Sequence, residues 1–168
     1  WLRAGKQYRA RNLIPEFERC VSEARPRWWL MECTTLAPPP IIAGYVANRL
    51  VLDNRWFGAV QRRRRAFTFG MTGHDAGKLI VQVATFDAAE IERCVLASDG
   101  KRNGAGCNLP DRKATMSARC MTYARACELQ GLDSDFLSDA PFTKEGRWRV
   151  VGNGVPIVMG RALARAVR

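Results

Sequence analysis

The segment most informative about the fold of this chain is Phe57-Gly58-Ala59-Val60-Gln61-Arg62-Arg63-Arg64-Arg65-Ala66-Phe67-Thr68-Phe69-Gly70. Four arginines lie between a Phe-Gly turn and a short apolar run, which predicts a buried strand over 66–69. Because side chains alternate along a strand, we expect Arg63 and Arg65 on one face and Arg62 and Arg64 on the other. Guanidinium groups fixed at the start of a buried strand are suited to hold an anionic or planar group.

The remaining segments alternate between helical and strand patterns, which favours an α/β fold. Helices are predicted over 13–24, 122–130 and 155–167 from apolar spacing, from Thr122 and Gly131 as caps, and from Pro26 and Pro156 as boundaries. Strands are predicted over 28–31, over 49–52 and within 78–86. The strand over 28–31 is expected to be buried and to pair with a parallel neighbour. We expect a turn or short helix over 41–46 and loops over 1–10 and 132–147.

Composition favours a polyanionic partner. The chain has 168 residues and a net charge of +11, from 27 Lys and Arg against 16 Asp and Glu. Nucleic acid is the leading candidate for a chain this basic. A basic protein whose charge serves only solubility or assembly stays an open alternative. Hydrophobic residues make up 47% of the sequence, enough for a folded core.

The cysteines indicate reduced thiols rather than a metal site or a disulfide framework. None of the six forms a Cys-x-x-Cys pair, and His74 is the single histidine, so we predict no metal. A chain of this length does not need disulfides, and we expect a cytosolic protein. No apolar run approaches the length of a transmembrane helix, and no signal peptide opens the sequence, so no membrane partner is expected.

Three motifs in order resemble those of DNA cytosine-5 methyltransferases. The stretch 61–65 is similar to the family's Gln-x-Arg-x-Arg, which also follows a Phe-Gly pair. The segment 28–34 resembles the strand that ends in Glu-Asn-Val, written here as Glu32-Cys33-Thr34. The segments 119–132 and 152–156 are similar to the family's two last motifs.

The resemblance implies an α/β fold: part of a Rossmann-like S-adenosylmethionine-dependent methyltransferase sheet with a small irregular target-recognition insert. Residues 1–70 would be the C-terminal part of the catalytic domain, and 71–118 the insert, compact as in phage enzymes. Residues 119–168 would return to pack on the catalytic domain.

The implied activity is transfer of a methyl group from S-adenosylmethionine to C5 of cytosine in double-stranded DNA, after the base has been flipped out of the duplex. Glu32 would hydrogen-bond the cytosine at N3 and at its amine, and Arg63 and Arg65 would hold the cytosine O2 and the neighbouring phosphate. The expected DNA contacts are Gln61, Arg62, Arg64, Lys101 and Arg102. The expected contacts with S-adenosylmethionine are Leu13, Asn153, Gly154 and Val155, where 152–156 opens the last helix and its amides receive an anion.

Two family features are missing from this sequence. No cysteine follows a proline, although the family's nucleophile lies in a Pro-Cys dipeptide, and the Gly-rich cofactor turn is absent. Because the chain opens at Trp1, we expect a missing N-terminal part or a second subunit to carry the nucleophile, in a bacterial or phage-infected cytoplasm. The chain alone is expected to be inactive. The alternative is a non-catalytic, basic DNA-binding remnant of such an enzyme; nothing specific favours an RNA-directed relative.

Overall fold

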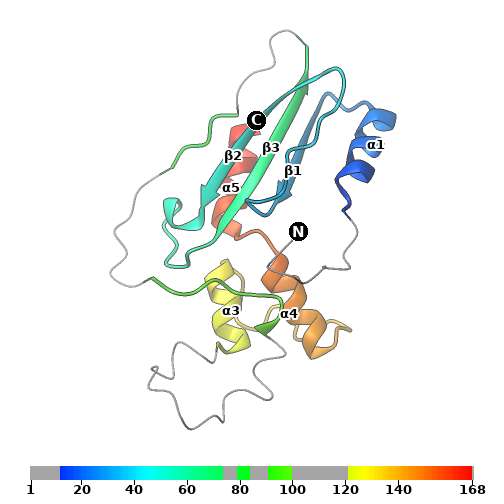
Figure 1. Cartoon of the computed structure of the whole chain (residues 1–168). Helices are drawn as coiled ribbons and strands as arrows, with labels where there is room; N and C mark the ends of the chain where they lie inside the picture. The colour runs from blue at the N-terminus through cyan, green and yellow to red at the C-terminus, as the bar shows by residue number, and fades with distance from the viewer. Residues whose placement is uncertain (1–11, 74–78, 84–90, 100–120, 168) are drawn as a thin grey trace, which may run out of the picture. The chain divides into compact units, whose positions relative to one another are not determined.

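The computed structural model describes residues 12–73, 79–83, 91–99 and 121–167. These residues form mixed α/β structure in two compact units (Figure 1). Unit 1 comprises 1–53 and 64–80, and unit 2 comprises 54–63 and 81–168. The boundary between the units therefore falls inside the arginine run, between Arg63 and Arg64.

Unit 1 contains a three-stranded sheet in the order β1-β3-β2. The strands are β1 (Trp28–Cys33), β2 (Tyr45–Asp53) and β3 (Arg64–Thr72). The central β3 pairs antiparallel with both neighbours. It follows that β1 and β2 point the same way, and that their carboxyl ends share one edge of the sheet with the start of β3.

The expected parallel pairing of the strand over 28–31 was wrong. β1 pairs with the antiparallel β3, and its residues alternate between buried and more exposed positions, as in a strand with one covered face. The strand predicted over 66–69 is longer at both ends, because two arginines and three further residues join the ladder. The mixed α/β class is confirmed, while the Rossmann-like methyltransferase sheet stays a prediction.

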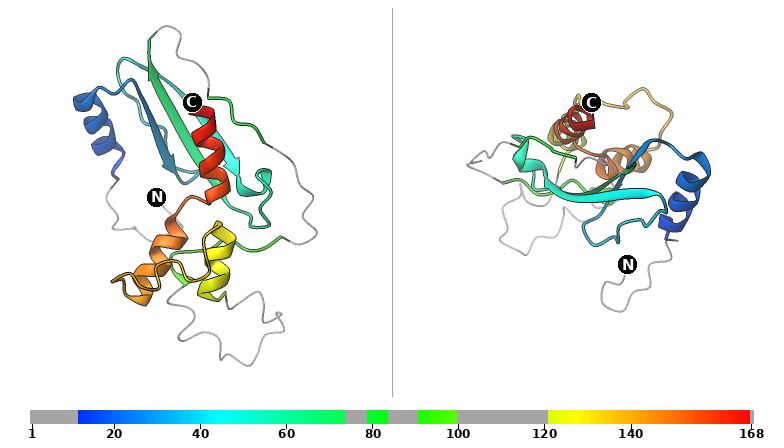
Figure 2. Two further views of the ribbon diagram at one scale, coloured as in Figure 1. Left: turned by 180° about the vertical axis from the view of Figure 1, so that it is seen from behind. Right: turned by 90° about the horizontal axis from the view of Figure 1, so that it is seen from above.

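Helix α1 (Ile14–Ala24) covers one face of the sheet, beside β1 in Figures 1 and 2. Its apolar residues pack on Trp29 and Met31, and the rings of Phe17 and Trp29 meet edge to face with centroids 5.6 Å apart. The helix ends as predicted before Pro26, with Arg25 in the left-handed conformation. The segment 34–44 connects β1 to β2 and adds Ala37 and Ile42 to this core.

Unit 2 contains α3 (Tyr123–Gln130), α4 (Lys144–Asn153), α5 (Ile157–Val167) and the short 3-10 helix η1 (Asn54–Trp56). The caps of α3 are those predicted: the Thr122 hydroxyl accepts from the Arg125 amide, and Gly131 closes the helix with a φ of 76°. Trp148 and Val151 of α4 pack with α3 around a small core.

Three other expectations for this part of the chain need correction. The loop expected over 132–147 ends early, because α4 begins at Lys144 behind a Thr143 cap. Its few apolar residues give a weak helical period. Helix α5 begins at Ile157, after Pro156. Residues 79–83 form no strand, while 1–10 and the rest of 78–86 lie mainly outside the described residues.

Among the described helices, none is both long and apolar enough to cross a membrane.

The close approach of two strands explains Gly70. Trp29 of β1 faces Gly70 of β3, and a Cβ at Gly70 would lie 2.1 Å from the buried indole. An added methyl group must displace a large ring that is packed against Phe17 and Tyr45.

We expect Gly70→Ala to lower the free energy of unfolding by about 2 kcal/mol or more, the usual cost of overpacking a core. Gly160→Ala is the matched control, since nothing lies within 4 Å of its Cβ position in α5. Alanine there should raise stability by up to about 1 kcal/mol. Urea denaturation measures both, and equal stability of Gly70→Ala and the wild type would contradict the packing.

Candidate functional site

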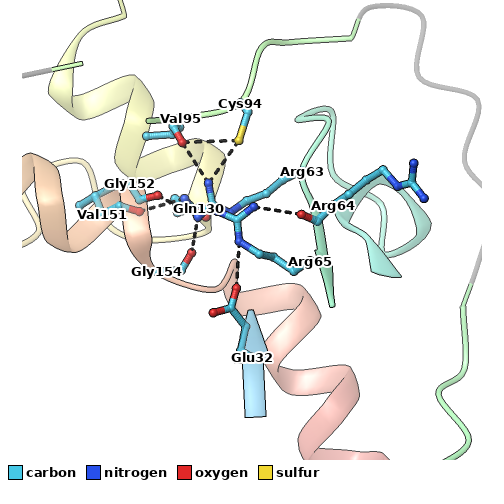
Figure 3. Close-up of polar contacts among 10 residues, drawn as sticks. All are labelled: Glu32, Arg63, Arg64, Arg65, Cys94, Val95, Gln130, Val151, Gly152 and Gly154. Carbon is cyan, nitrogen blue, oxygen red and sulfur yellow. Dashed lines mark hydrogen bonds and ion pairs between the residues drawn. The ribbon is translucent and has the colours of Figure 1, made fainter. Parts of the chain in front are cut away.

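Burial along the arginine run alternates as the sequence predicts. Gln61 and Arg63 are buried, whereas Arg62 and Arg64 are exposed and Arg65 is half-buried. The regular strand begins only at Arg64, so Gln61 and Arg63 belong to unit 2 and Arg65 belongs to unit 1. The run therefore contributes to two separate polar clusters, both drawn in Figure 3.

The first cluster, in unit 2, is built around the guanidinium group of Arg63, which is 1% exposed. It donates to the carbonyl oxygens of Val95 at 2.9 Å, Gly152 at 2.8 Å and Gly154 at 2.9 Å, and contacts the Cys94 sulfur at 3.2 Å (Figure 3). These carbonyls come from two segments far apart in the sequence. A planar fork with five N–H donors suits such a task, and a lysine ammonium would not.

Gln61 extends the same network. Its amide donates to the Leu129 carbonyl at 2.9 Å and accepts from the Val95 amide at 3.4 Å. Gln130 in turn donates to the Val151 carbonyl at 2.9 Å. The structure thus gives Gln61 and Arg63 a stabilising role inside unit 2, and their expected contacts with DNA and with the target base stay predictions.

The turn at 152–156 differs from the expectation. Gly152 and Asn153 end α4 rather than open α5, and the Gly154 amide donates to the Val150 carbonyl at 3.0 Å. That amide is therefore already used and does not point at an anion. Gly152 is required by a close approach, because a Cβ there would lie 2.3 Å from the Ala97 nitrogen. Asn153 is exposed and Val155 is half-buried.

The second cluster, in unit 1, is an ion pair between Glu32 and Arg65. Arg65 Nε lies 2.8 Å from Glu32 Oε1, and Arg65 Nη1 donates to the Arg64 carbonyl at 2.9 Å (Figure 3). The side chain of Glu32 is 32% exposed and that of Arg65 is 20% exposed. The pair is partly desolvated, yet its remaining polar atoms are within reach of solvent or a ligand.

Strand register explains why these two side chains meet. Glu32 is the partner of Phe67 in the antiparallel ladder, and Arg65 precedes Phe67 by two residues. Residues two apart on a strand share a face, and diagonal neighbours are within reach of long side chains. Both residues also lie at the edge where β1 ends and β3 begins.

Cys33 follows Glu32 but faces the other way. It packs against the core beneath α1, and burial, together with the charge of Glu32, raises the pKa of its thiol. The group is therefore protonated at neutral pH, and a thiol is a far weaker nucleophile than a thiolate. Cys33 is thus poorly suited to attack a substrate held by Glu32.

The atoms of the second cluster that have no partner determine which ligand groups it can bind. Within the described residues, hydrogen bonds and the ion pair engage Oε1 of Glu32 and two nitrogens of Arg65, which leaves Glu32 Oε2 and Arg65 Nη2. A carboxyl oxygen beside a guanidinium N–H can bind a planar group that offers a donor and an acceptor on one edge. The described side chains contain no group of His, Cys, Asp and Glu able to hold a metal ion.

The other predicted residues are dispersed. Leu13 precedes α1 and is exposed, and its contact with S-adenosylmethionine stays a prediction. Lys101 and Arg102 lie outside the described residues. The segment 92–95, which meets Gln61 and Arg63, was not predicted, because its sequence carries neither a helical nor a strand period.

We expect Arg63→Lys to lower the free energy of unfolding by about 2 kcal/mol, since a lysine leaves two of the three carbonyls without a donor at about 1 kcal/mol each. Arg62→Lys is the matched control: it is the same change at the exposed neighbour, with an expected effect within about 0.5 kcal/mol. Urea denaturation followed by circular dichroism compares them. Indistinguishable midpoints would show that the Arg63 network does not stabilise unit 2.

No protein-family model matches the chain, and no curated protein sequence matches it.

Proposed function

We propose that this chain is the base-holding part of a DNA cytosine-5 methyltransferase, which transfers a methyl group from S-adenosylmethionine to C5 of cytosine. The observation that carries the proposal is the 2.8 Å ion pair between Glu32 and Arg65. These two residues come from different motifs, and the resemblance assigns both to the same flipped base. Their contact at one edge of the sheet is what that assignment requires.

The unused atoms of the pair, together with the second lone pair of Glu32 Oε1, match cytosine. The Watson–Crick edge of this base presents O2 and N3 as acceptors and the N4 amine as a donor. A Glu32 carboxyl oxygen accepts from N4, as carboxylates do in cytosine recognition. The protonated carboxyl group donates to N3, and Arg65 Nη2 donates to O2. A flipped base fits such an arrangement, because only an extruded nucleotide exposes this edge.

The reaction assigns each residue a task. Attack of a thiolate at C6 pushes the ring electrons toward N3, where the Glu32 proton neutralises the developing negative charge. Carbon C5 then becomes nucleophilic and takes the methyl group, and N3 returns its proton to the Glu32 carboxylate. A water molecule accepts the C5 proton as the thiolate departs, which restores the aromatic ring. Arg65 holds the carboxyl group in place and binds O2, so the charge is stabilised without reorganisation.

S-adenosylmethionine, when bound, supplies the methyl group. Among the residues assigned to it, the exposed Leu13 can pack on an apolar part of the molecule, and the exposed Asn153 offers an amide for hydrogen bonding. Gly154 fits less well, since its amide and its carbonyl are already engaged by Val150 and Arg63. Its contribution would be to shape the turn.

The attacking cysteine has to come from another polypeptide segment. None of the six cysteines follows a proline, and Cys33 faces the core on the side of the strand opposite Glu32. The proposal therefore includes a second segment or subunit with the Pro-Cys motif, and the isolated chain should not transfer methyl groups.

A non-catalytic basic DNA-binding protein is the second candidate. It is favoured by the net charge of +11 and by the exposed arginines Arg62 and Arg64, which have no carboxylate partner within the described residues. It gives no reason for Glu32 to be held by Arg65. The two candidate functions can be separated by a variant in which the carboxyl group of Glu32 is replaced by an amide.

The test is single-turnover methyl transfer to duplex DNA by the complete enzyme, in which this chain is combined with the polypeptide that carries Pro-Cys. Glu32→Gln keeps the shape but cannot deliver the proton, so the rate should fall about a hundredfold or more while DNA affinity changes little. Glu16→Gln, the same change in an exposed ion pair of α1, should leave the rate unchanged. A Glu32→Gln enzyme as fast as the wild type would reject the assigned role and favour the second candidate.

A further inference from the structure

Three exposed arginines on the described helices are neutralised by a nearby carboxylate. Arg19 pairs with Glu16 and Glu23 in α1, and Arg149 pairs with Glu145 in α4. The same holds for Arg125, which is paired with Glu92 and Glu128. These side chains contribute to the formal charge of +11 but little to the local field, since each cation lies beside an anion.

Helix α5 is different. Its sequence contains Arg161 and Arg165 and no acidic residue, and both arginines are exposed. No carboxylate in the described part of the chain pairs with either of them. Two unneutralised guanidinium groups on a single helix concentrate positive potential on one surface, which distinguishes α5 from α1 and α4.

The two arginines lie on the same face of α5. Residues four apart on a helix are neighbours about 6 Å apart. Their neighbours on this face include the exposed Ala164 and, one turn earlier, the exposed Val158. Along one DNA strand the phosphate charges recur at about 3.4 Å of helix rise, which two long arginines at this spacing can follow.

The opposite face of α5 is already occupied by the fold. Met159 and Leu163 are buried there. An amphipathic helix that binds a membrane surface needs its apolar face for the lipid, so this helix has none to offer. A charged surface with only a single exposed valine, Val158, beside it is typical instead of contacts with a phosphate backbone.

We propose that the exposed face of α5, formed by Arg161, Ala164 and Arg165, binds the phosphate backbone of duplex DNA. The inference rests on the proposed function for the identity of its partner, but it adds a contact surface away from the motifs that suggested that function. The contact is independent of base sequence and serves to position the duplex. Arg165 in the last turn also complements the helix dipole, a role that affects stability only.

Binding of a fluorescent DNA duplex to the full chain, measured by anisotropy between about 50 and 200 mM salt, tests this surface. Each phosphate contact contributes about 0.9 to the slope of log affinity against log salt concentration. We therefore expect Arg161→Gln with Arg165→Gln to lower the magnitude of the slope by about 1.8. Replacing both arginines by lysine should preserve most of the slope, because the charges remain.

The matched control is Arg19→Gln with Arg149→Gln, which removes the same formal charge from neutralised positions and should change the slope by less than about 0.5. Equal effects of the two double variants would show that affinity follows net charge alone and would overturn the inference. A wild-type chain that fails to bind duplex DNA would overturn both the inference and the proposed partner. Tighter binding of duplex RNA than of duplex DNA would contradict the choice of DNA. Circular dichroism verifies that α5 persists in each variant.

Discussion

A buried guanidinium group must donate its hydrogen bonds to fixed acceptors, and Arg63 satisfies this constraint with three backbone carbonyls. The carbonyl of Val95 belongs to an irregular segment, while those of Gly152 and Gly154 flank the end of α4. One side chain thus adds hydrogen bonds between segments of unit 2 that also share a hydrophobic core, in which Val95 packs with Trp148 and Val151. Leaving a buried cation without its acceptors costs several kcal/mol, so the segment that carries Arg63 is fixed in place.

The second cluster depends on the register of the sheet in unit 1. Arg65 lies in β3, two residues before the partner of Glu32, so its side chain is on the same face as that partner. There it meets Glu32 at the edge where β1 ends. The proposed base-holding pair is therefore placed by strand register within unit 1, unlike a surface ion pair of two flexible side chains, which would be worth little.

Local patterns predicted much of this structure. Helix α1, the caps of α3 and the exposure of the arginine run follow from spacing, from Thr122 and Gly131, and from strand alternation. The direction of β1 could not be predicted, because an apolar run does not specify its partner, and α4 has too few apolar residues to give a period. The sequence did not predict the contact between Glu32 and Arg65, and their assignment to one base by the resemblance stays a prediction. The buried hydrogen bonds of Gln61 and Arg63 could not be predicted, because their carbonyl acceptors belong to segments far away in the sequence.

The central claim is that Glu32 and Arg65 together recognise an extruded cytosine. Its most direct test is the affinity of the chain for two otherwise identical duplexes, one with cytosine and one with thymine opposite an abasic site, where the base is already free to leave the stack. Because thymine has a carbonyl where cytosine has the amine that Glu32 accepts from, we predict about tenfold tighter binding to the cytosine duplex, within the range for one good base contact. Equal affinity for the two duplexes would contradict the account.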